Sequence, residues 1–149
     1  MKQLIFICLI GLFTISCNQN KKAEQTTNQS TDEFAPSGDV VEVIYFHGTQ
    51  RCPTCQAIEA ETKSLIESSF ADAINSKKLI FKIVDISKPE NKAIADRYDV
   101  AWSSLFVNDW KKDQESVNNL TEFAFTNARN NPDAFKRGLS EKINEFLAN

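Results

Sequence analysis

The chain has 149 residues, of which 42% are hydrophobic and 25% are charged. This composition is typical of a globular protein with one modest core, and it excludes a disordered or fibrous chain. The formal net charge is -3, and the sequence contains no long basic block. We therefore expect no nucleic-acid partner, because such proteins need a concentrated positive surface.

The first residues have the pattern of a bacterial lipoprotein signal peptide. Lys2 precedes the apolar run 4–13, which is too short to span a bilayer as a mature helix. The run leads through Thr-Ile-Ser to Cys17 and resembles a lipobox, in which the cysteine is lipidated. Thr14 stands where this motif usually has an aliphatic residue, and the alternative is a plain secretory signal with an incidental Cys17. We expect residues 1–16 to be the signal peptide.

The segment that follows is predicted to be a lipidated flexible tether. Residues 17–38 are rich in Asn, Gln, Thr and Ser and contain almost nothing to bury. Such a linker lets the folded domain, residues 39–149, reach partners away from the membrane surface. The lipid and weak surface contacts hold the tether at the membrane. We expect the domain to lie in the periplasm, at either the inner or the outer membrane.

The folded part begins with a strand and a helix. Residues 40–46 are rich in β-branched and aromatic residues, which predicts a buried strand. Residues 47–51 are expected to form a loop, with Cys52 and Pro53 as the cap and the first residue of a helix. Apolar residues recur at helical spacing from there to about Ser76.

A second strand and a short helix follow. Residues 79–86 are almost continuously apolar, as is typical of a central strand that is covered on both faces. Ser87 and Glu90 predict a capping box for a short helix that ends near Tyr98. The order strand, helix, strand implies a right-handed parallel crossover.

The last elements are a hairpin and a terminal helix. Residues 104–107 predict a third strand, with residues 116–120 as its partner across the polar turn 111–114. Asn131 and Pro132 indicate the start of a helix. The apolar face of this helix consists of Phe135, Leu139, Ile143, Phe146 and Leu147.

Two cysteines, Cys52 and Cys55, remain for the folded domain. Cys8 lies in the signal peptide, and Cys17 is the expected lipid site. Across a helix start, residues at this spacing lie within the distance of about 4.4 to 6.8 Å between α-carbons that a disulfide tolerates. A sulfur at a helix N-terminus faces unpaired N–H groups, which favour the thiolate. With Arg51 as a neighbouring positive charge, we expect Cys52 to be the nucleophile and Cys55 the resolving thiol.

The residues between the cysteines also bear on reactivity. Pro53 and Thr54 are expected to tune the reduction potential, because residues there alter the helix-start donors that stabilise the thiolate. A ring of four residues gives little stabilising entropy compared with a long-range bridge. This argues against a purely structural disulfide, although an oxidising compartment leaves that alternative open.

Metal binding is the other alternative for the cysteine pair. A tetrahedral structural zinc site needs four protein ligands, and the sequence offers one histidine, His47, and no spare cysteine. We expect no resident metal and no cofactor. Cu(I) is the metal best suited to the two thiolates. A metal-binding or metal-delivery lipoprotein without turnover therefore stays open, as does a binding module that only retains the fold.

The order of these features resembles the thioredoxin superfamily over residues 40–149. The features are a strand that runs into Cys-Pro-Thr-Cys at a helix start, the crossover through residues 80–85, and the segment 98–100. The resemblance implies an α/β thioredoxin-like fold with a central mixed sheet flanked by helices. It also implies a site of dithiol–disulfide exchange at Cys52 and Cys55.

Two segments look like a narrower group. Residues 45–55 and 119–124 are similar to a family of small bacterial thioredoxin-like proteins labelled nitrophenyl compound nitroreductase subunit ArsF. The sequence contains nothing that resembles a flavin or nicotinamide site, so this label is a poor guide to activity.

The chain departs from the superfamily pattern at several positions. Arg51 stands where a Trp usually precedes the first cysteine. Ser103 or Ser104 takes the place of the cis-proline that faces the cysteine pair and shields its sulfurs. Tyr45 occupies the place of a buried acid that helps proton transfer. Trp102 and Trp110 are the two candidates to line a substrate groove. We prefer Trp102 because it lies next to the expected active-site loop.

The leading hypothesis is an envelope thiol:disulfide oxidoreductase or redox carrier. Its substrate is a disulfide or dithiol in a protein or small molecule, and the reaction passes through a mixed disulfide. An electron donor or acceptor of the envelope completes the cycle, in either direction.

Overall fold

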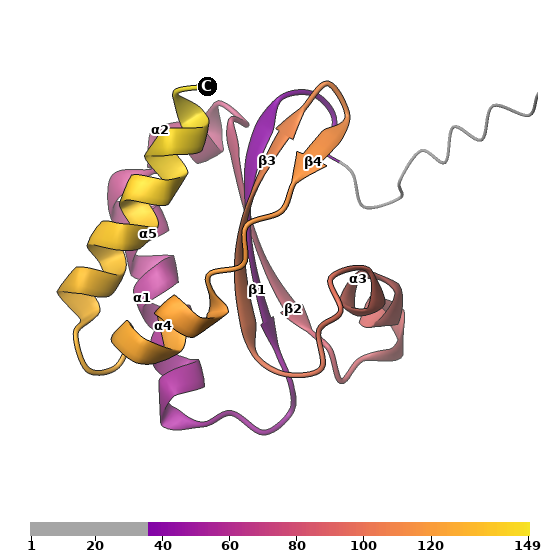
Figure 1. Ribbon diagram of the computed structural model, residues 1–149, viewed down its shortest axis with the longest axis vertical. Coiled ribbons are helices and arrows are strands. Elements are labelled where there is room, and N and C mark those ends of the chain that lie inside the picture. Colours follow the sequence, from indigo (N-terminus) through magenta and orange to yellow (C-terminus); the bar gives the residue numbers. More distant parts are fainter. Residues whose placement is uncertain (1–35) are drawn as a thin grey trace, which may run out of the picture. The chain divides into compact units, whose positions relative to one another are not determined.

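The computed structural model describes residues 36–149 (Figure 1). The predicted signal peptide, the predicted lipid site Cys17 and most of the predicted tether lie outside the described residues. Within the described part, no helix has the length and apolar character needed to cross a membrane.

A four-stranded mixed sheet forms the centre of the domain, in the order β2-β1-β3-β4. The strands are β1 (Val40–His47), β2 (Leu79–Asp85), β3 (Ser104–Lys111) and β4 (Gln114–Ser116). β2 is parallel to β1, whereas β3 is antiparallel to both β1 and β4. The parallel pairing of β1 and β2 across an intervening helix confirms the predicted crossover connection.

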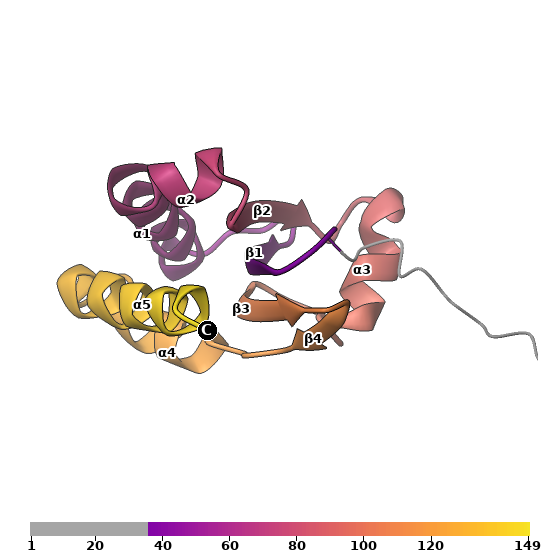
Figure 2. The same cartoon turned by 90° about the horizontal axis from the view of Figure 1, so that it is seen from above.

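Helices cover both faces of the sheet. They are α1 (Pro53–Ser69), α2 (Ala71–Asn75), the short 3-10 helix η1 (Pro89–Asn91), α3 (Lys92–Arg97), α4 (Thr121–Asn127) and α5 (Pro132–Leu147). α1, α4 and α5 lie on one side of the sheet, and α3 lies on the other (Figure 2). The expected α/β fold with a central mixed sheet flanked by helices is confirmed.

The alternation of side chains along β1 builds a core on each side of the sheet. Val43 and Tyr45 belong to the larger cluster, which includes Phe135 of α5. Ile44 and Phe46 belong to the smaller cluster under α3. Because successive residues of a strand point to opposite faces, a single central strand contributes to both cores.

The helix predicted to continue to about residue 76 is interrupted at Phe70. This residue has φ -125° and ψ 16°, outside the helical region, and it ends α1 before α2 begins. Its side chain is buried in the larger core cluster. The apolar periodicity therefore extends over two helices, because a residue that turns the chain is itself a core residue.

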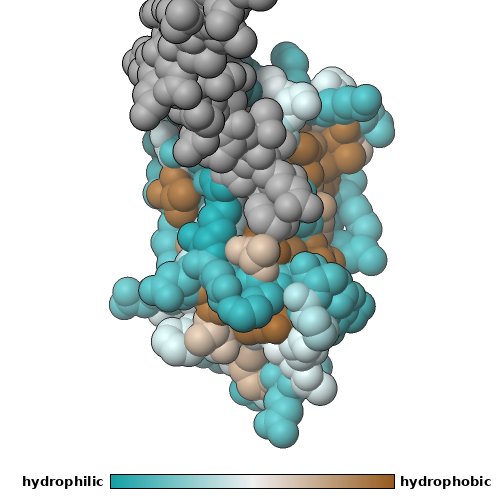
Figure 3. Space-filling view, turned by 90° about the vertical axis from the view of Figure 1, so that its right-hand side faces the viewer, coloured by the Kyte–Doolittle hydropathy of each residue, from teal (hydrophilic) through white to brown (hydrophobic). Residues whose placement is uncertain are grey.

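β2 is an edge strand, so its expected central position is wrong. Its apolar residues serve both cores, since Leu79 packs on the α1 side and Val84 on the α3 side. Ile83 remains 43% exposed. The face of the molecule that carries α3 is mainly hydrophilic, with smaller hydrophobic areas between (Figure 3). The apolar run of β2 therefore indicates that both faces of the strand are covered, but it does not indicate whether the strand has a neighbour on each side in the sheet.

The expected capping box at Ser87 and Glu90 does not form. The backbone N–H and the hydroxyl of Ser87 both donate to Asp85 Oδ1, at 3.0 and 2.6 Å. The chain then enters η1 without a side-chain cap. Asp85 competes successfully for Ser87 because an aspartate bonds readily to a group two residues further along in a turn.

A hairpin forms here, but its bounds differ from the prediction: β3 continues to Lys111, and β4 is Gln114–Ser116 and not 116–120. Lys112 and Asp113 are the two turn residues, and both have positive φ, of 50° and 63°. Positive φ at both residues is what a two-residue type I′ hairpin turn requires. After β4, the chain returns to β3 through a single bridge between Asn119 and Phe106.

The terminal helix α5 is also confirmed, since Asn131 Oδ1 accepts a hydrogen bond from the Ala134 N–H at 3.2 Å and caps it. The short helix α4, between the hairpin and α5, was not predicted as an element.

Candidate functional site

Cys52 and Cys55 form a disulfide at the N-terminus of α1. Their α-carbons are 5.0 Å apart, within the range that the sequence spacing predicts. Cys52 is the N-cap residue, and its Sγ accepts a hydrogen bond from the Cys55 N–H at 3.1 Å. Cys52 is exposed, whereas Cys55 is only 7% exposed. The pair therefore consists of one exposed and one buried cysteine.

The local sequence explains this placement. β1 ends at His47, and a short loop brings the chain to the start of α1. Pro53 and Thr54 are the first two residues of the helix after the Cys52 cap. Pro53 has no N–H, so it leaves no donor unsatisfied at the helix start. If the Cys55 N–H keeps this direction after reduction, we expect it and the helix dipole to stabilise a Cys52 thiolate.

A cavity of about 780 Å³ opens beside the disulfide. Its walls come from the loop before α1, the loop between α3 and β3, β3 itself and the beginning of α4. The lining residues are Gly48, Gln50, Cys52, Cys55, Tyr98, Asp99, Val100, Ala101, Trp102, Ser103, Ser104, Phe106, Asn119, Thr121, Glu122 and Phe125. A substrate segment that occupies this cavity lies directly against the cysteine pair.

The loop before β3 brings Ser103 and Ser104 to this cavity. Both are buried, and the Ser104 hydroxyl donates to the Trp102 carbonyl at 3.1 Å. Trp102 is 69% exposed at the cavity, so it can contact a substrate. Trp110 is instead a core residue, with its N–H donated to the buried Glu42 at 3.1 Å. The sequence preference for Trp102 over Trp110 agrees with this geometry.

Arg51 does not line the cavity. Its guanidinium is paired with the Glu59 carboxylate on α1 and lies 5.9 Å from the centre of the Tyr45 ring. Burial lowers the pKa of Arg51, but hydrogen bonds to Tyr45 and Glu59 outweigh this effect and raise the pKa above its ordinary value. Glu59 offsets the charge of Arg51. We therefore expect a Cys52 thiolate to be stabilised mainly by the N–H groups and the dipole at the start of α1.

Tyr45 connects β1 to the active-site turn. Its side chain is fully buried, and its hydroxyl donates to the Cys55 carbonyl at 2.7 Å. The hydroxyl thus holds the first turn of α1 against the central strand. Where the superfamily resemblance places a buried acid, this chain has a tyrosine that positions the backbone of Cys55.

His47 lies at the end of β1 and does not line the cavity. Its Nδ1 is 3.1 Å from the Gly48 carbonyl oxygen, and its ring stacks 6.1 Å from that of Tyr45. In the described residues, no group of three or more His, Cys, Asp or Glu side chains has the arrangement of a metal site.

The contribution of α4 to the cavity was not predicted from the sequence. Thr121 and Phe125 line it from this helix, and Asn119 lies just before the helix. Thr121 Oγ1 accepts a hydrogen bond from the Leu105 N–H at 3.1 Å, which ties α4 to β3 beside the cysteine pair. In the sequence, only the similarity of residues 119–124 to a family motif pointed to this segment as part of the site.

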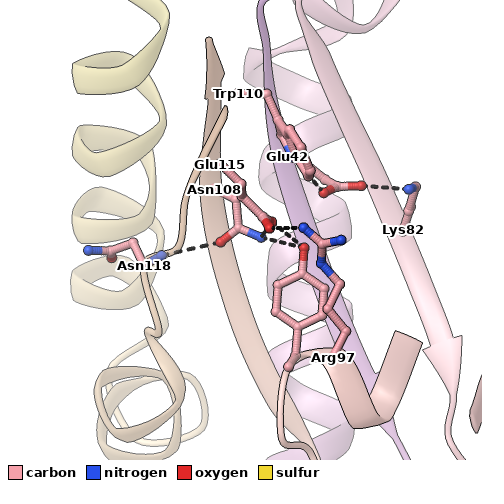
Figure 4. A network of polar contacts seen from close by, with 8 residues as sticks. Glu42, Lys82, Arg97, Asn108, Trp110, Glu115 and Asn118 are labelled. Carbon is pink, nitrogen blue, oxygen red and sulfur yellow. Dashed lines mark hydrogen bonds and ion pairs between the residues drawn. The ribbon is translucent and has the colours of Figure 1, made fainter. Parts of the chain in front are cut away.

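A polar network that includes Arg97, Asn108 and Glu115 (Figure 4) also holds Tyr98, which lines the cavity. The Tyr98 hydroxyl donates to Glu115 on β4 and accepts a hydrogen bond from Asn108 at 3.0 Å. Arg97 pairs with the same glutamate at 2.6 Å. The Tyr98 ring packs against Phe106, with ring centres 5.2 Å apart. This network holds Tyr98 in place, and the loop that contains Trp102 and Ser103 begins after Tyr98.

Solved structures with similar folds include two thioredoxins and one thioredoxin-like domain. The thioredoxin from Thermus thermophilus is 18% identical, with a TM-score of 0.45, and the match covers 70% of this chain and 76% of that one. The Trx4 domain of ERdj5 is 15% identical, with a TM-score of 0.47 and coverages of 73% and 84%. Thioredoxin-2 of a malaria parasite is 18% identical, with a TM-score of 0.42 and coverages of 67% and 84%.

No protein-family model and no curated protein sequence matches the chain. The narrower ArsF-labelled family is therefore not confirmed. The TM-scores lie below 0.5, so the description of the fold depends on the chain itself: a parallel β1-α1-β2 crossover, antiparallel β3 and β4, and a cysteine pair at the start of α1. The chain combines a thioredoxin-like fold with a Cys52–Cys55 pair that is suited to thiol redox chemistry.

Proposed function

We propose that this protein is a thiol:disulfide oxidoreductase or redox carrier of the bacterial envelope. One observation supports the proposal: Cys52 is exposed at a helix start and lines a cavity, while Cys55, which lines the same cavity, is only 7% exposed. A structural bridge needs no accessible sulfur and no space beside it. An exchange site needs both, because the partner disulfide must approach the attacking sulfur.

The reaction requires only the two cysteines of the pair and the partner disulfide. The Cys52 thiolate attacks one sulfur of the partner, a mixed disulfide forms, and the other partner sulfur leaves as a thiolate that takes up a proton. Cys55 then attacks Cys52 Sγ, which re-forms the intramolecular disulfide and releases the second partner thiol. The partner gains two electrons and two protons, and the Cys52–Cys55 dithiol loses them. The reverse sequence oxidises a partner dithiol.

The location is part of the same proposal. The signal-like segment, the lipobox-like Cys17 and the polar linker favour a lipid-anchored protein with its domain in the periplasm. An envelope electron donor or acceptor then restores the pair after each turnover. Cys17→Ala in the full chain is expected to move the protein from the membrane fraction to the soluble periplasmic fraction. A membrane fraction unchanged by Cys17→Ala contradicts the lipid anchor.

The reduction potential of the pair tests the redox role. The measurement uses the full chain with Cys8→Ser and Cys17→Ser, equilibrated in glutathione or dithiothreitol buffers, so that Cys52–Cys55 is the one dithiol. A catalytic pair is expected between about -120 and -270 mV, and the value indicates the direction of transfer. A potential below about -300 mV identifies a structural disulfide and removes the proposal.

A further inference from the structure

The cavity beside the disulfide carries an unbalanced charge. Asp99 lines it from the loop after α3, and Glu122 lines it from the first turn of α4. Among the lining residues, all of which belong to the described chain, none is Lys, Arg or His. Neither carboxylate forms an ion pair with another described residue. Within the described chain, the cavity lining therefore carries two acidic residues and no basic residue that could compensate their charge.

Two basic residues that neighbour lining residues in the sequence are engaged in ion pairs outside the cavity lining. Arg51, adjacent to Cys52 in the sequence, is paired with Glu59 and lies against Tyr45. Arg97, adjacent to Tyr98, is paired with Glu115 at 2.6 Å. These ion pairs reduce the extent to which either guanidinium offsets the charge of Asp99 and Glu122.

The remaining lining residues indicate what else a substrate must carry. Phe106 and Phe125 are aromatic residues in the cavity wall, and Trp102 is exposed at the same cavity. The volume of about 780 Å³ is that of a site for several side chains or a small molecule. Apolar side chains bind such a wall because they leave water, whereas a negative charge beside two carboxylates is repelled.

We propose that this cavity selects disulfide-bonded peptide segments with an apolar side chain and a positive charge near the cysteine, and that it discriminates against anionic disulfides such as that of glutathione. The inference rests on the proposed function, since it names the substrate class of the same site. Asp99 and Glu122 act as specificity-determining residues. They favour approach and docking of a cationic segment and take no part in the sulfur exchange.

The test uses two synthetic peptides, each acetylated, amidated and joined as a disulfide homodimer. They share a Cys and a Phe and differ only in a Lys or a Glu beside them. The full chain with Cys8→Ser and Cys17→Ser is reduced in advance, freed of reductant and mixed with each peptide, so that the dithiol of Cys52 and Cys55 supplies both electrons. The second-order rate constant for reduction of each peptide by the protein is divided by the rate constant for reduction of the same peptide by dithiothreitol. This ratio corrects for the intrinsic reactivity of each peptide disulfide.

The Lys peptide is expected to react about tenfold faster than the Glu peptide at low salt, with the ratio falling towards one near 1 M salt. The double variant Asp99→Asn/Glu122→Gln should lose most of this preference. The matched control Glu90→Gln/Glu141→Gln removes two exposed carboxylates that do not line the cavity, and it should retain the preference.

Equal normalised rates for the two peptides in the parent chain overturn the charge selectivity but leave the exchange activity in place. A preference that survives Asp99→Asn/Glu122→Gln overturns the assignment to these residues. If neither peptide reacts while dithiothreitol still reduces both, the proposed function itself fails, and the inference fails with it.

Discussion

The hydroxyl of Tyr98, at the end of α3, donates a hydrogen bond to the carboxylate of Glu115 on β4. This contact joins two elements that are 17 residues apart in the sequence, and Asn108 donates to both partners. The ring of Tyr98 meanwhile lines the cavity of the cysteine pair. One side chain thus connects the polar network at the edge of the sheet to the wall of the candidate site.

Removal of the hydroxyl tests this connection. Tyr98→Phe keeps the ring but leaves Glu115 and Asn108 without a shared partner, and it is expected to lower the free energy of unfolding by about 1 to 2 kcal/mol. Denaturant unfolding of Tyr98→Phe against the parent chain measures the effect. Glu90→Gln, an exposed position of η1, is the control and should change stability by less than about 0.5 kcal/mol.

The alkaline limb of the stability curve gives a second readout of the same contact. Burial and the hydrogen bond to Glu115 raise the pKa of Tyr98 well above its ordinary value of 10.0. A raised pKa in the folded state gives stability that is present at lower pH and is lost as the pH rises above 10.0, where the unfolded chain begins to ionise. Tyr98→Phe should show a shallower alkaline loss, and identical slopes in both chains contradict the contact.

Single cysteine substitutions separate the two sulfurs. Cys52→Ser should abolish exchange, because the exposed nucleophile is absent. Cys55→Ser should retain the first attack and accumulate mixed disulfides, since the resolving thiol is absent. Mixed disulfides are measured by non-reducing electrophoresis and mass spectrometry after acid quenching. If Cys52→Ser traps partners and Cys55→Ser does not, the assigned roles are reversed.

The ion pair between Arg51 and Glu59 is expected to adjust the reduction potential. Glu59→Gln leaves the guanidinium charge uncompensated beside the active-site turn, which favours the Cys52 thiolate and hence the reduced state. The potential should become more positive by about 10 to 30 mV. Glu67→Gln, on the same helix and paired with Lys63, is the matched control. A shift of equal size in the control means that the ion pair has no specific effect.

Close packing between α4 and α5 predicts the effect of a small substitution. A Cβ added at Gly138 lies 2.5 Å from a ring carbon of Phe123, and this ring stacks against that of Phe135. Alanine gains about 1 kcal/mol in helix propensity over glycine, but the overpacking is expected to cost about 1 to 3 kcal/mol. Thermal unfolding should therefore show Gly138→Ala to be neutral or destabilised. Phe123→Leu in the same chain should relieve the clash, and clear stabilisation by Gly138→Ala alone contradicts the packing.

Local patterns in the sequence determined most of the elements and the identity of the cysteine pair. The β-branched run of β1, the Asn131-Pro132 helix start and the Cys-Pro-Thr-Cys spacing each depend on residues close in the chain. Such residues act through local backbone geometry, hydrogen-bond capping and side-chain periodicity. The same local rules failed at Phe70, where a buried side chain turns the chain, and at Ser87, which Asp85 engages instead.

Beyond Trp102, Ser103 and Ser104, which the resemblance placed near the cysteines, only the tertiary structure decided which residues surround the pair. The cavity receives residues from α4, from Tyr98 and from the loop of Asp99. They come together because β3 pairs with β1 and with β4, and these pairings join residues that are far apart in the sequence. It also decided that Arg51 faces Glu59, and that β2 lies at the sheet edge. An apolar run reports that side chains are buried, but not what they contact, because hydrophobic burial has no direction. The reactive pair can therefore be predicted from the sequence, whereas the surface that selects its partners depends on the folded chain.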